Sequence, residues 1–208
     1  MRIITGSARG IKLITLEGEA TRPTTDRVKE AIFSMIQFDI EGRAVLDLFA
    51  GSGQLALEAL SRGAARATLI DQSRDAVDVI IENAKKTRLF DKCRVSAADY
   101  TSFIRGAAGR EKYDLIFLDP PYNTGLLPTA LKALANADLC AVGSHIICET
   151  DCDIPVKNSR LRKNEEITAE AVRNDVFGGN DELMSRFEVK KSTLYGRTRI
   201  TVLTPVAK

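Results

Sequence analysis

The segment that starts at Ala44 constrains the fold of this chain more than any other. It reads AVLDLFAGSG, a short and almost entirely apolar run that ends in Gly51 and Gly53. Such a run suits a central parallel strand that is buried on both faces. The two glycines permit a tight turn from the strand into a helix and a close approach of a ligand to the backbone. The segment therefore predicts a strand–turn–helix unit with a binding loop at its turn.

After this unit, apolar strands alternate with amphipathic helices along the chain. Apolar residues recur at helical spacing, which predicts helices over residues 54–63, 73–87 and 126–137. Short apolar runs bounded by polar residues predict further strands at residues 67–71, 93–99, 113–119 and 144–150. This order predicts an α/β fold with a doubly wound, mostly parallel sheet.

The two ends of the chain depart from this pattern. Two apolar runs separated by glycines predict a small N-terminal β-hairpin within residues 1–16, and a helix with an apolar face follows from residue 26. Residues 187–203 predict a C-terminal antiparallel hairpin. We expect an N-terminal extension over residues 1–40 and a sheet domain over residues 41–208, within one globular unit. Residues 151–185 are mixed, with an expected mobile loop at 178–181.

Composition excludes several classes of protein. Apolar residues make up 44% and charged residues 28% of the 208 positions, which is typical of a soluble globular domain. No apolar run is long enough to cross a bilayer, and the N-terminus lacks the apolar stretch of a secretory signal, so we expect a cytoplasmic protein without membrane contact. Four cysteines without CxxC spacing and a single histidine predict no metal site. We also expect a monomer.

Basic residues gather in three stretches, although the net charge is only +2. Residues 1–16 and 157–163 carry basic side chains and no acid, and residues 186–208 carry six basic residues against Glu188 alone. Such stretches can converge on a phosphate backbone, but charge alone favours ordinary solvated faces.

The glycine loop fits two kinds of nucleoside cofactor. The pattern GSGQLA matches a dinucleotide fingerprint, and Asp71 ends the next strand 20 residues after Gly51, where a carboxylate can bind ribose hydroxyls. Asp99 ends the third strand, on the side expected for the adenine. Asp71 and Asp99 have the alternative role of helix caps. This part of the sequence leaves NAD and S-adenosylmethionine open.

Asp47 favours one of the two cofactors. It lies beside the loop, four residues before Gly51. A carboxylate there attracts a ligand with an ammonium and a sulfonium charge and repels a pyrophosphate. This favours S-adenosylmethionine over NAD.

The tetrad Asp119-Pro120-Pro121-Tyr122 follows the fourth strand and decides between NAD and S-adenosylmethionine. Ligands bind at the carboxyl ends of strands in open α/β sheets. The prolines fix the backbone and leave carbonyl oxygens without neighbouring N–H donors, Asp119 adds a carboxylate, and Tyr122 adds an aromatic face. Together they suit a planar group that bears an NH2. Acceptors for its N–H bonds favour pyramidalisation of the nitrogen, and Asp119 stabilises the positive charge that grows on it during methyl transfer.

These segments resemble a known family. Residues 45–71 and DLIFLDPPY are similar to class I S-adenosylmethionine-dependent methyltransferases of the DPPY type. RIITGSARGIKL, RPTTDRVKEAIFSMI and the tail YGRTRITVL resemble the RsmD family, bacterial methyltransferases of guanine N2 in 16S ribosomal RNA. The resemblance covers nearly the whole chain and is weakest at residues 151–187. It implies a Rossmann-like methyltransferase sheet, S-adenosylmethionine as the methyl donor, and the small ribosomal subunit as the partner.

The resemblance also assigns roles to individual residues. It implies that Asp47, Gly51 and Gly53 line the methionine end of the cofactor, that Asp71 holds the ribose, and that Asp99 lies at the adenine. The predicted cofactor site is completed by Phe49, Ser52, Gln72, Tyr100 and Asp119. Asp119, Pro120 and Tyr122 are the expected catalytic residues. The expected substrate-binding residues are Pro121, Tyr122, Arg22, Thr25, Arg27 and Arg9.

The chain departs from the family pattern at three positions. Gln54 and Ala56 replace the smaller alanine and glycine of GSGALGLEAL, and Lys29 stands where arginine is common. Arg22 and Arg27 have an alternative to binding the cofactor carboxylate or RNA, namely solvation at the start of a helix. Lys29 has the alternative of an ion pair with Asp26 or Glu30.

Three other functions remain open. The same tetrad occurs in methyltransferases of adenine and of protein glutamine, although the chain lacks an obvious recognition domain for duplex DNA and has Asp119 where the glutamine enzymes usually carry Asn. A non-catalytic RNA-binding module with this fold is a further alternative. An NAD-dependent reductase is the least favoured.

Overall fold

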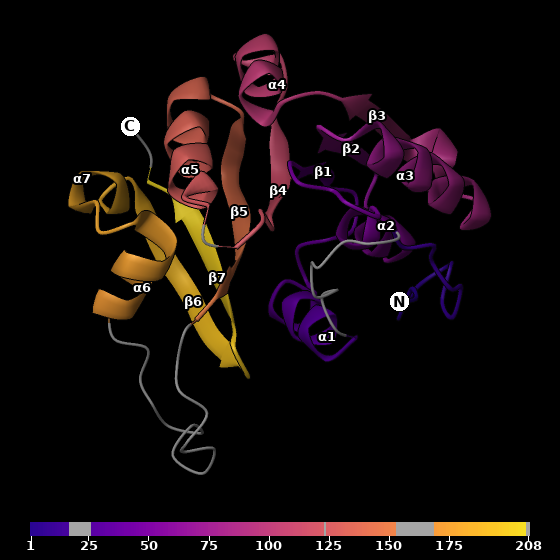
Figure 1. The fold of residues 1–208 in the computed structure, drawn as a ribbon, viewed down its shortest axis with the longest axis horizontal. Coiled ribbons are helices and arrows are strands. Elements are labelled where there is room, and N and C mark those ends of the chain that lie inside the picture. The colour runs from indigo at the N-terminus through magenta and orange to yellow at the C-terminus, as the bar shows by residue number, and fades with distance from the viewer. Residues whose placement is uncertain (17–25, 123, 153–168, 207–208) are drawn as a thin grey trace.

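The computed structural model describes residues 1–16, 26–122, 124–152 and 169–206. They form one twisted sheet with helices on both faces (Figure 1). The strands are β1 (Ala44–Asp47), β2 (Arg66–Asp71), β3 (Cys93–Ala97), β4 (Tyr113–Leu118), β5 (Cys140–Asp151), β6 (Phe187–Tyr195) and β7 (Thr198–Pro205). The helices are α1 (Asp26–Met35), α2 (Gln54–Ser61), α3 (Arg74–Lys86), α4 (Tyr100–Ala107), α5 (Leu126–Ala137), α6 (Ala169–Phe177) and α7 (Asp181–Met184), with a 3-10 turn at Phe90–Lys92.

The strand order is β3-β2-β1-β4-β5-β7-β6. Strands β1 to β5 run parallel, whereas β7 pairs antiparallel with both β5 and β6. The predicted doubly wound sheet with a C-terminal antiparallel hairpin is therefore confirmed. The chain order reverses between β1 and β4, and such a switch point opens a crevice at the carboxyl ends of the strands.

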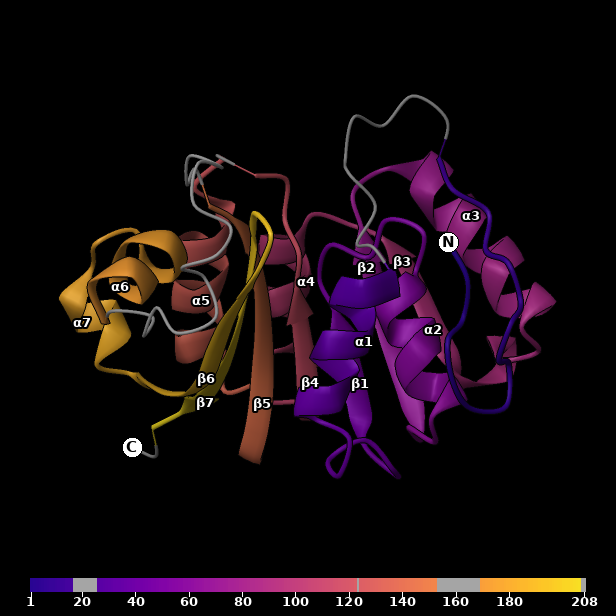
Figure 2. The same cartoon turned by 90° about the horizontal axis from the view of Figure 1, so that it is seen from below.

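Alternating strand residues divide the core into two layers. Val45 and Phe117 face a cluster formed with α1, α2 and α3, while Leu46 and Leu118 face α4, α5, α6 and α7. Figure 2 shows α1 and α2 in front of the sheet and α4 and α5 behind it. Burial of β1 on both faces confirms the expectation from its apolar run.

The N-terminal residues form a hairpin-like loop that packs on the first layer. Its two arms meet at a single antiparallel bridge between Arg2 and Lys12, and Ile3 also donates its N–H to the carbonyl of Ile11 and accepts a bond from Gly10 N–H. Ile3, Ala8 and Leu13 are buried in the same cluster as α1 and α2. The predicted hairpin is present, although it carries one bridge rather than two regular strands.

The segment before the C-terminal hairpin is more regular than we expected. Helices α6 and α7 flank Gly178 and Gly179, whose positive φ values of 59° and 77° turn the chain between them. Asn180 caps α7 by accepting a bond from Leu183 N–H. The expectation of a mixed segment is wrong for residues 169–184, because the apolar face of α6 was not recognised in the sequence. Residues 153–168 lie outside the described residues.

Candidate active site

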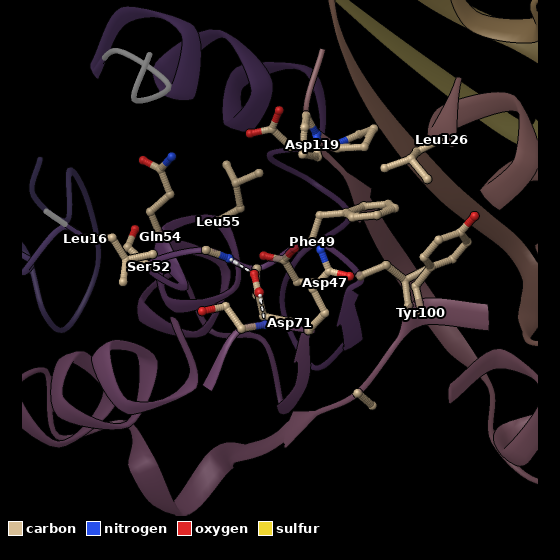
Figure 3. Close-up of a pocket in the computed structure, with 18 of the residues that line it drawn as sticks. Leu16, Asp47, Phe49, Ser52, Gln54, Leu55, Asp71, Tyr100, Asp119 and Leu126 are labelled. Carbon is tan, nitrogen blue, oxygen red and sulfur yellow. Dashed lines mark hydrogen bonds between the residues drawn. The ribbon is translucent and has the colours of Figure 1, made fainter. Parts of the chain in front are cut away.

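A cavity of about 510 Å³ lies at the carboxyl ends of β1, β2 and β4, at the switch point of the sheet. Figure 3 shows its side chains converging from the glycine loop, from the end of β2, from the start of α4 and from the segment after β4. These segments are up to about 70 residues apart in the sequence, and the parallel sheet brings their ends to one edge. Most of the predicted site residues line the cavity, namely Asp47, Phe49, Gly51, Ser52, Asp71, Gln72, Asp99, Tyr100, Asp119, Pro120, Pro121 and Tyr122.

Gly53 supports the cavity from behind and does not line it. Its φ is +77°, and a Cβ there would lie 3.2 Å from Leu69 Cδ2 and 3.4 Å from two carbons of Ile80. The missing side chain therefore lets α2 begin close to β2 and α3. The predicted contact of Gly53 with the cofactor stays a prediction, and its position indicates a role in packing the loop.

The basic residues predicted for RNA lie elsewhere. Arg9 and Arg27 are exposed and do not line the cavity, and Arg22 and Thr25 lie outside the described residues. Lys29 is fully buried, with its Nζ donating to the carbonyl of Arg2 and lying 3.4 Å from Glu58. The alternative of a surface ion pair between Lys29 and Asp26 or Glu30 is therefore wrong, because Lys29 faces α2 and not solvent.

Asp71 connects the glycine loop to the start of α3. One carboxylate oxygen accepts a bond from Gly51 N–H at 2.9 Å, and the other accepts one from Ser73 N–H at 2.9 Å. Ser73, not Asp71, is the N-cap of α3. Each carboxylate oxygen can accept a second bond, so the side chain retains acceptors that suit two vicinal hydroxyls.

Asp47 is almost completely buried beneath the loop. Backbone N–H groups of Phe49 and Ala56 bond to its carboxylate, but its Oδ1 has no hydrogen-bond partner among the described residues. Burial raises the pKa of Asp47 to about 7, and the nearby charge of Asp71 adds to this shift. A buried carboxylate with an unused oxygen favours a cationic ligand, because a positive charge stabilises its ionised form.

Asp99 caps α4 at the opposite side of the cavity. Its Oδ1 accepts bonds from Thr101 N–H and Ser102 N–H, so the alternative role of an N-cap is confirmed. The Thr101 hydroxyl and these N–H groups hold the pKa of Asp99 below its usual value. The next residue, Tyr100, lies with its ring centroid 5.1 Å from that of Phe49. The two rings give this end of the cavity an apolar wall that suits a planar base.

The tetrad after β4 forms the remaining wall. Asp119 and Pro120 follow the buried end of β4, and Tyr122 turns back toward β5. The Tyr122 hydroxyl donates to Glu149 Oε1 at 2.9 Å, and Glu149 is 3% exposed. Burial raises the pKa of Tyr122, and the Glu149 and Asp119 carboxylates raise it further, so the phenol stays protonated. Glu149 therefore fixes the direction of the Tyr122 ring.

Similar proteins place this arrangement in a family. A family model described as conserved hypothetical protein 95 matches residues 1–179. A Bacillus subtilis protein named putative rRNA methyltransferase YlbH is 39% identical over 155 residues, 74% of this chain and 84% of the relative. Ribosomal RNA small subunit methyltransferase D of Escherichia coli K12 is 37% identical over 153 residues, 74% of this chain and 76% of the relative. This chain belongs to the RsmD family of S-adenosylmethionine-dependent methyltransferases.

A solved structure agrees with this assignment. The structure titled putative methyltransferase yhhF from Escherichia coli superposes with a TM-score of 0.78 at 28% sequence identity, and the match covers 100% of this chain and 99% of that one. The RsmD resemblance seen in the sequence therefore extends to the whole fold.

The cavity has the groups that S-adenosylmethionine requires. The cofactor carries an ammonium and a sulfonium charge, a ribose and an adenine. The unpartnered oxygen of Asp47 offers an acceptor for the ammonium group. The remaining lone pairs of Asp71 suit the ribose, and the rings of Phe49 and Tyr100 suit the adenine. The residues of this RsmD family member therefore fit the cofactor.

Several lining residues were missed in the sequence. Met1, Thr15 and Leu16 belong to the N-terminal segment, whose path over the cavity no local pattern reveals. The sequence identifies Gln54 only as a departure from the family pattern. That departure is the feature from which its place in the cavity could have been predicted. The role of Glu149 beside the cavity could not be predicted, because the sequence shows only a charged residue near the end of an apolar strand.

Two structural criteria apply to the described residues, one for metal clusters and one for membrane-spanning helices. Within residues 1–16, 26–122, 124–152 and 169–206, no cluster of three or more His, Cys, Asp or Glu side chains could hold a metal ion. Within the same residues, no helix combines the length and the apolar character needed to cross a bilayer.

Proposed function

We propose that this chain transfers a methyl group from S-adenosylmethionine to the exocyclic N2 amine of a guanine in 16S ribosomal RNA of the small ribosomal subunit. One observation carries the proposal. Asp119 and Tyr122 share a single cavity with Asp47 and Asp71, so an amine receptor and a nucleoside cofactor site open into the same space. Relatives named ribosomal RNA small subunit methyltransferase D support the choice of RNA.

The chain's own residues supply positioning and charge stabilisation. When bound, S-adenosylmethionine would supply an electrophilic methyl group and leave as S-adenosylhomocysteine, and the methylated amine would then lose one proton to solvent. Asp119 accepts an N–H bond of the guanine amine, which turns the nitrogen lone pair toward the methyl group, and it stabilises the positive charge that develops there. The ring of Tyr122 stacks on the extruded base, a contact worth about 1–3 kcal/mol. Glu149 holds that ring in place through its bond with the Tyr122 hydroxyl.

The basic residues of the N-terminal part are proposed to meet the RNA. Arg9 and Arg27 are exposed, and the N-terminal segment reaches the cavity through Thr15 and Leu16. In this proposal residues 1–40, including Arg22 and Thr25, face the RNA, while residues 41–208 form the methyltransferase domain. The protein acts as a monomer in the cytoplasm on the small subunit or its RNA.

The variant Asp119→Ala tests the chemistry. It should retain binding of S-adenosylhomocysteine within about threefold and lose methyl transfer by about 10²–10³-fold, because the growing charge on nitrogen loses its carboxylate. Transfer of labelled methyl to purified small subunits and to naked 16S RNA, followed by nucleoside analysis, measures this. Label in N2-methylguanosine that disappears in the variant supports the proposal. Label in N6-methyladenosine, or wild-type transfer by the variant, contradicts it.

A further inference from the structure

Gln54 has an unusual position at the start of α2. It is the first residue of the helix, directly after Gly53, and its side chain lines the cavity although only 8% of the residue is exposed. The family pattern GSGALGLEAL has a smaller residue at this position. Figure 3 shows Gln54 beside Leu16 and Ser52, on the other side of Asp47 from Tyr100.

The amide oxygen of Gln54 has no partner. Among the described residues, five buried side-chain polar atoms lack a hydrogen bond, and two of them line the cavity, Asp47 Oδ1 and Gln54 Oε1. A buried acceptor without a donor lowers the stability of the folded state, so such groups in native proteins call for a specific explanation. A ligand that brings a hydrogen-bond donor into the cavity would explain the unpartnered oxygen.

The position of Gln54 selects which part of the ligand supplies that donor. Figure 3 shows Asp71 between Gln54 and Tyr100, and the rings of Tyr100 and Phe49 mark the end that suits the adenine. Gln54 lies at the opposite end, which leaves the amino-acid part of the cofactor. Its ammonium group has three N–H donors, so it has a donor to spare for an acceptor beyond Asp47. A neutral amide adds this second acceptor without placing another negative charge beside Asp47.

We infer that Gln54 Oε1 accepts a hydrogen bond from the α-ammonium group of S-adenosylmethionine and that Gln54 thereby selects ligands with an amino-acid end. The inference rests on the proposed cofactor site and adds a binding residue to it. It predicts opposite effects of one substitution on ligand binding and on the stability of the unliganded protein, because the oxygen is useful only when the ligand is present.

The test compares two ligands and two variants in the full chain, without RNA. S-adenosylhomocysteine carries the amino-acid end, and 5′-methylthioadenosine lacks it. Gln54→Met keeps the length of the side chain and removes the acceptor. Calorimetry should show S-adenosylhomocysteine binding weakened about tenfold, since hydrogen bonds to charged groups are strong, and 5′-methylthioadenosine binding unchanged within about twofold. The unliganded melting temperature should stay the same or rise.

Gln72→Met is the matched control. Gln72 lines the cavity and directly follows Asp71, which suits the ribose that both ligands carry, so its replacement should change the affinity for both ligands by the same factor. The inference is overturned if Gln54→Met leaves S-adenosylhomocysteine binding unchanged, weakens both ligands equally, or lowers the unliganded melting temperature. Absence of S-adenosylhomocysteine binding by the wild-type protein would instead overturn the proposed function.

Discussion

Two buried polar regions of this protein adjoin α2, one around Glu58 within the helix and one at Gln54 at its start, and they differ in how their hydrogen bonds are completed. At the seam between the N-terminal segment and α2, Glu58 accepts bonds from Ile4 N–H, Thr5 N–H and Arg62, and it lies 3.4 Å from Lys29. In the cavity, oxygens of Asp47 and Gln54 have no partner among the described residues.

The difference indicates what each region is for. A buried group whose bonds are all made within the chain contributes to the folded state, and its removal exposes the partners it leaves behind. A buried group without a partner lowers stability and gains its bond only from a ligand. The seam is therefore expected to control folding and the cavity to control binding, and substitutions on the two sides should separate these effects.

The largest effect is expected from Glu58→Gln. Loss of this charge leaves Lys29 buried beside a neutral group, and removing one partner of a buried ion pair costs about 3–5 kcal/mol of unfolding free energy. Urea unfolding followed by circular dichroism measures it. Lys29→Met should cost less, because Glu58 retains Arg62 and two backbone donors. The double variant should cost less than the sum of the two single variants. Additive costs would show that the two residues do not form a coupled pair.

A smaller loss is expected from Gly6→Ala at the same seam. Gly6 has a φ of +86°, and a Cβ there would lie 1.8 Å from the Ser61 carbonyl oxygen. Gly10 is a matched control, since its φ is +84° and no atom lies within 4 Å of its Cβ position. Gly10→Ala should cost about 1–2 kcal/mol from backbone strain alone. Gly6→Ala should cost at least about 1 kcal/mol more. Equal melting temperatures for the two variants would contradict the close packing of the loop on α2.

The cavity itself was easier to predict than the seam. Asp47, Gly51 and Asp71 follow a local pattern, in which a strand ends in a glycine loop and the next strand ends in a carboxylate. The order of strands and helices then brings those ends together. The DPPY tetrad is likewise a continuous segment, so its place after β4 followed directly from the sequence.

The seam could not be predicted because its bonds join distant segments. Asn83 binds the backbone of Ile14, 69 residues away, and also the carbonyl of Ser52 in the glycine loop. Lys29 and Glu58 meet only after α1 and α2 pack on the same face of the sheet. One signal was present in the sequence: Glu58 is the one charged residue in QLALEALS, the segment that forms α2 and is buried throughout in the structure. A charge in an otherwise apolar helix indicates a buried partner.

On the cavity side, Asp47→Asn should raise stability instead of lowering it. Burial raises the pKa of Asp47 from 3.8 to about 7, so the folded protein binds a proton more readily than the unfolded chain between pH 4 and pH 7. The carboxylate's contribution to unfolding free energy therefore falls as the pH rises through that window. The variant should gain about 1–3 kcal/mol at pH 8 and little at pH 4. It should also bind S-adenosylhomocysteine more weakly.

Melting curves of wild-type and variant at pH 5 and pH 8, together with calorimetry, separate these effects. In the wild type, S-adenosylhomocysteine binding should weaken as the pH falls below 7, since the protonated carboxyl no longer attracts the ammonium group. A loss of stability in Asp47→Asn at pH 8 would show that the Asp47 carboxylate stabilises the folded state, as Glu58 is expected to do. The proposed difference between the two regions would then be wrong.

The smallest effect on stability is expected from Tyr122→Phe. This variant tests the difference between the two regions, because Tyr122 and Glu149 form a completed hydrogen bond inside the cavity. If completed bonds serve the folded state, Tyr122→Phe should lower the unfolding free energy by about 1 kcal/mol. If this bond instead directs the ring toward the base, KM for RNA should rise a few-fold while S-adenosylhomocysteine binding stays constant. We expect both, since the ring remains but its direction is no longer fixed. Tyr122→Ala is the control for the ring itself, and it should raise KM further by the loss of about 1–3 kcal/mol of stacking. Equal KM values for the two variants would show that the hydroxyl, and not the aromatic face, positions the base.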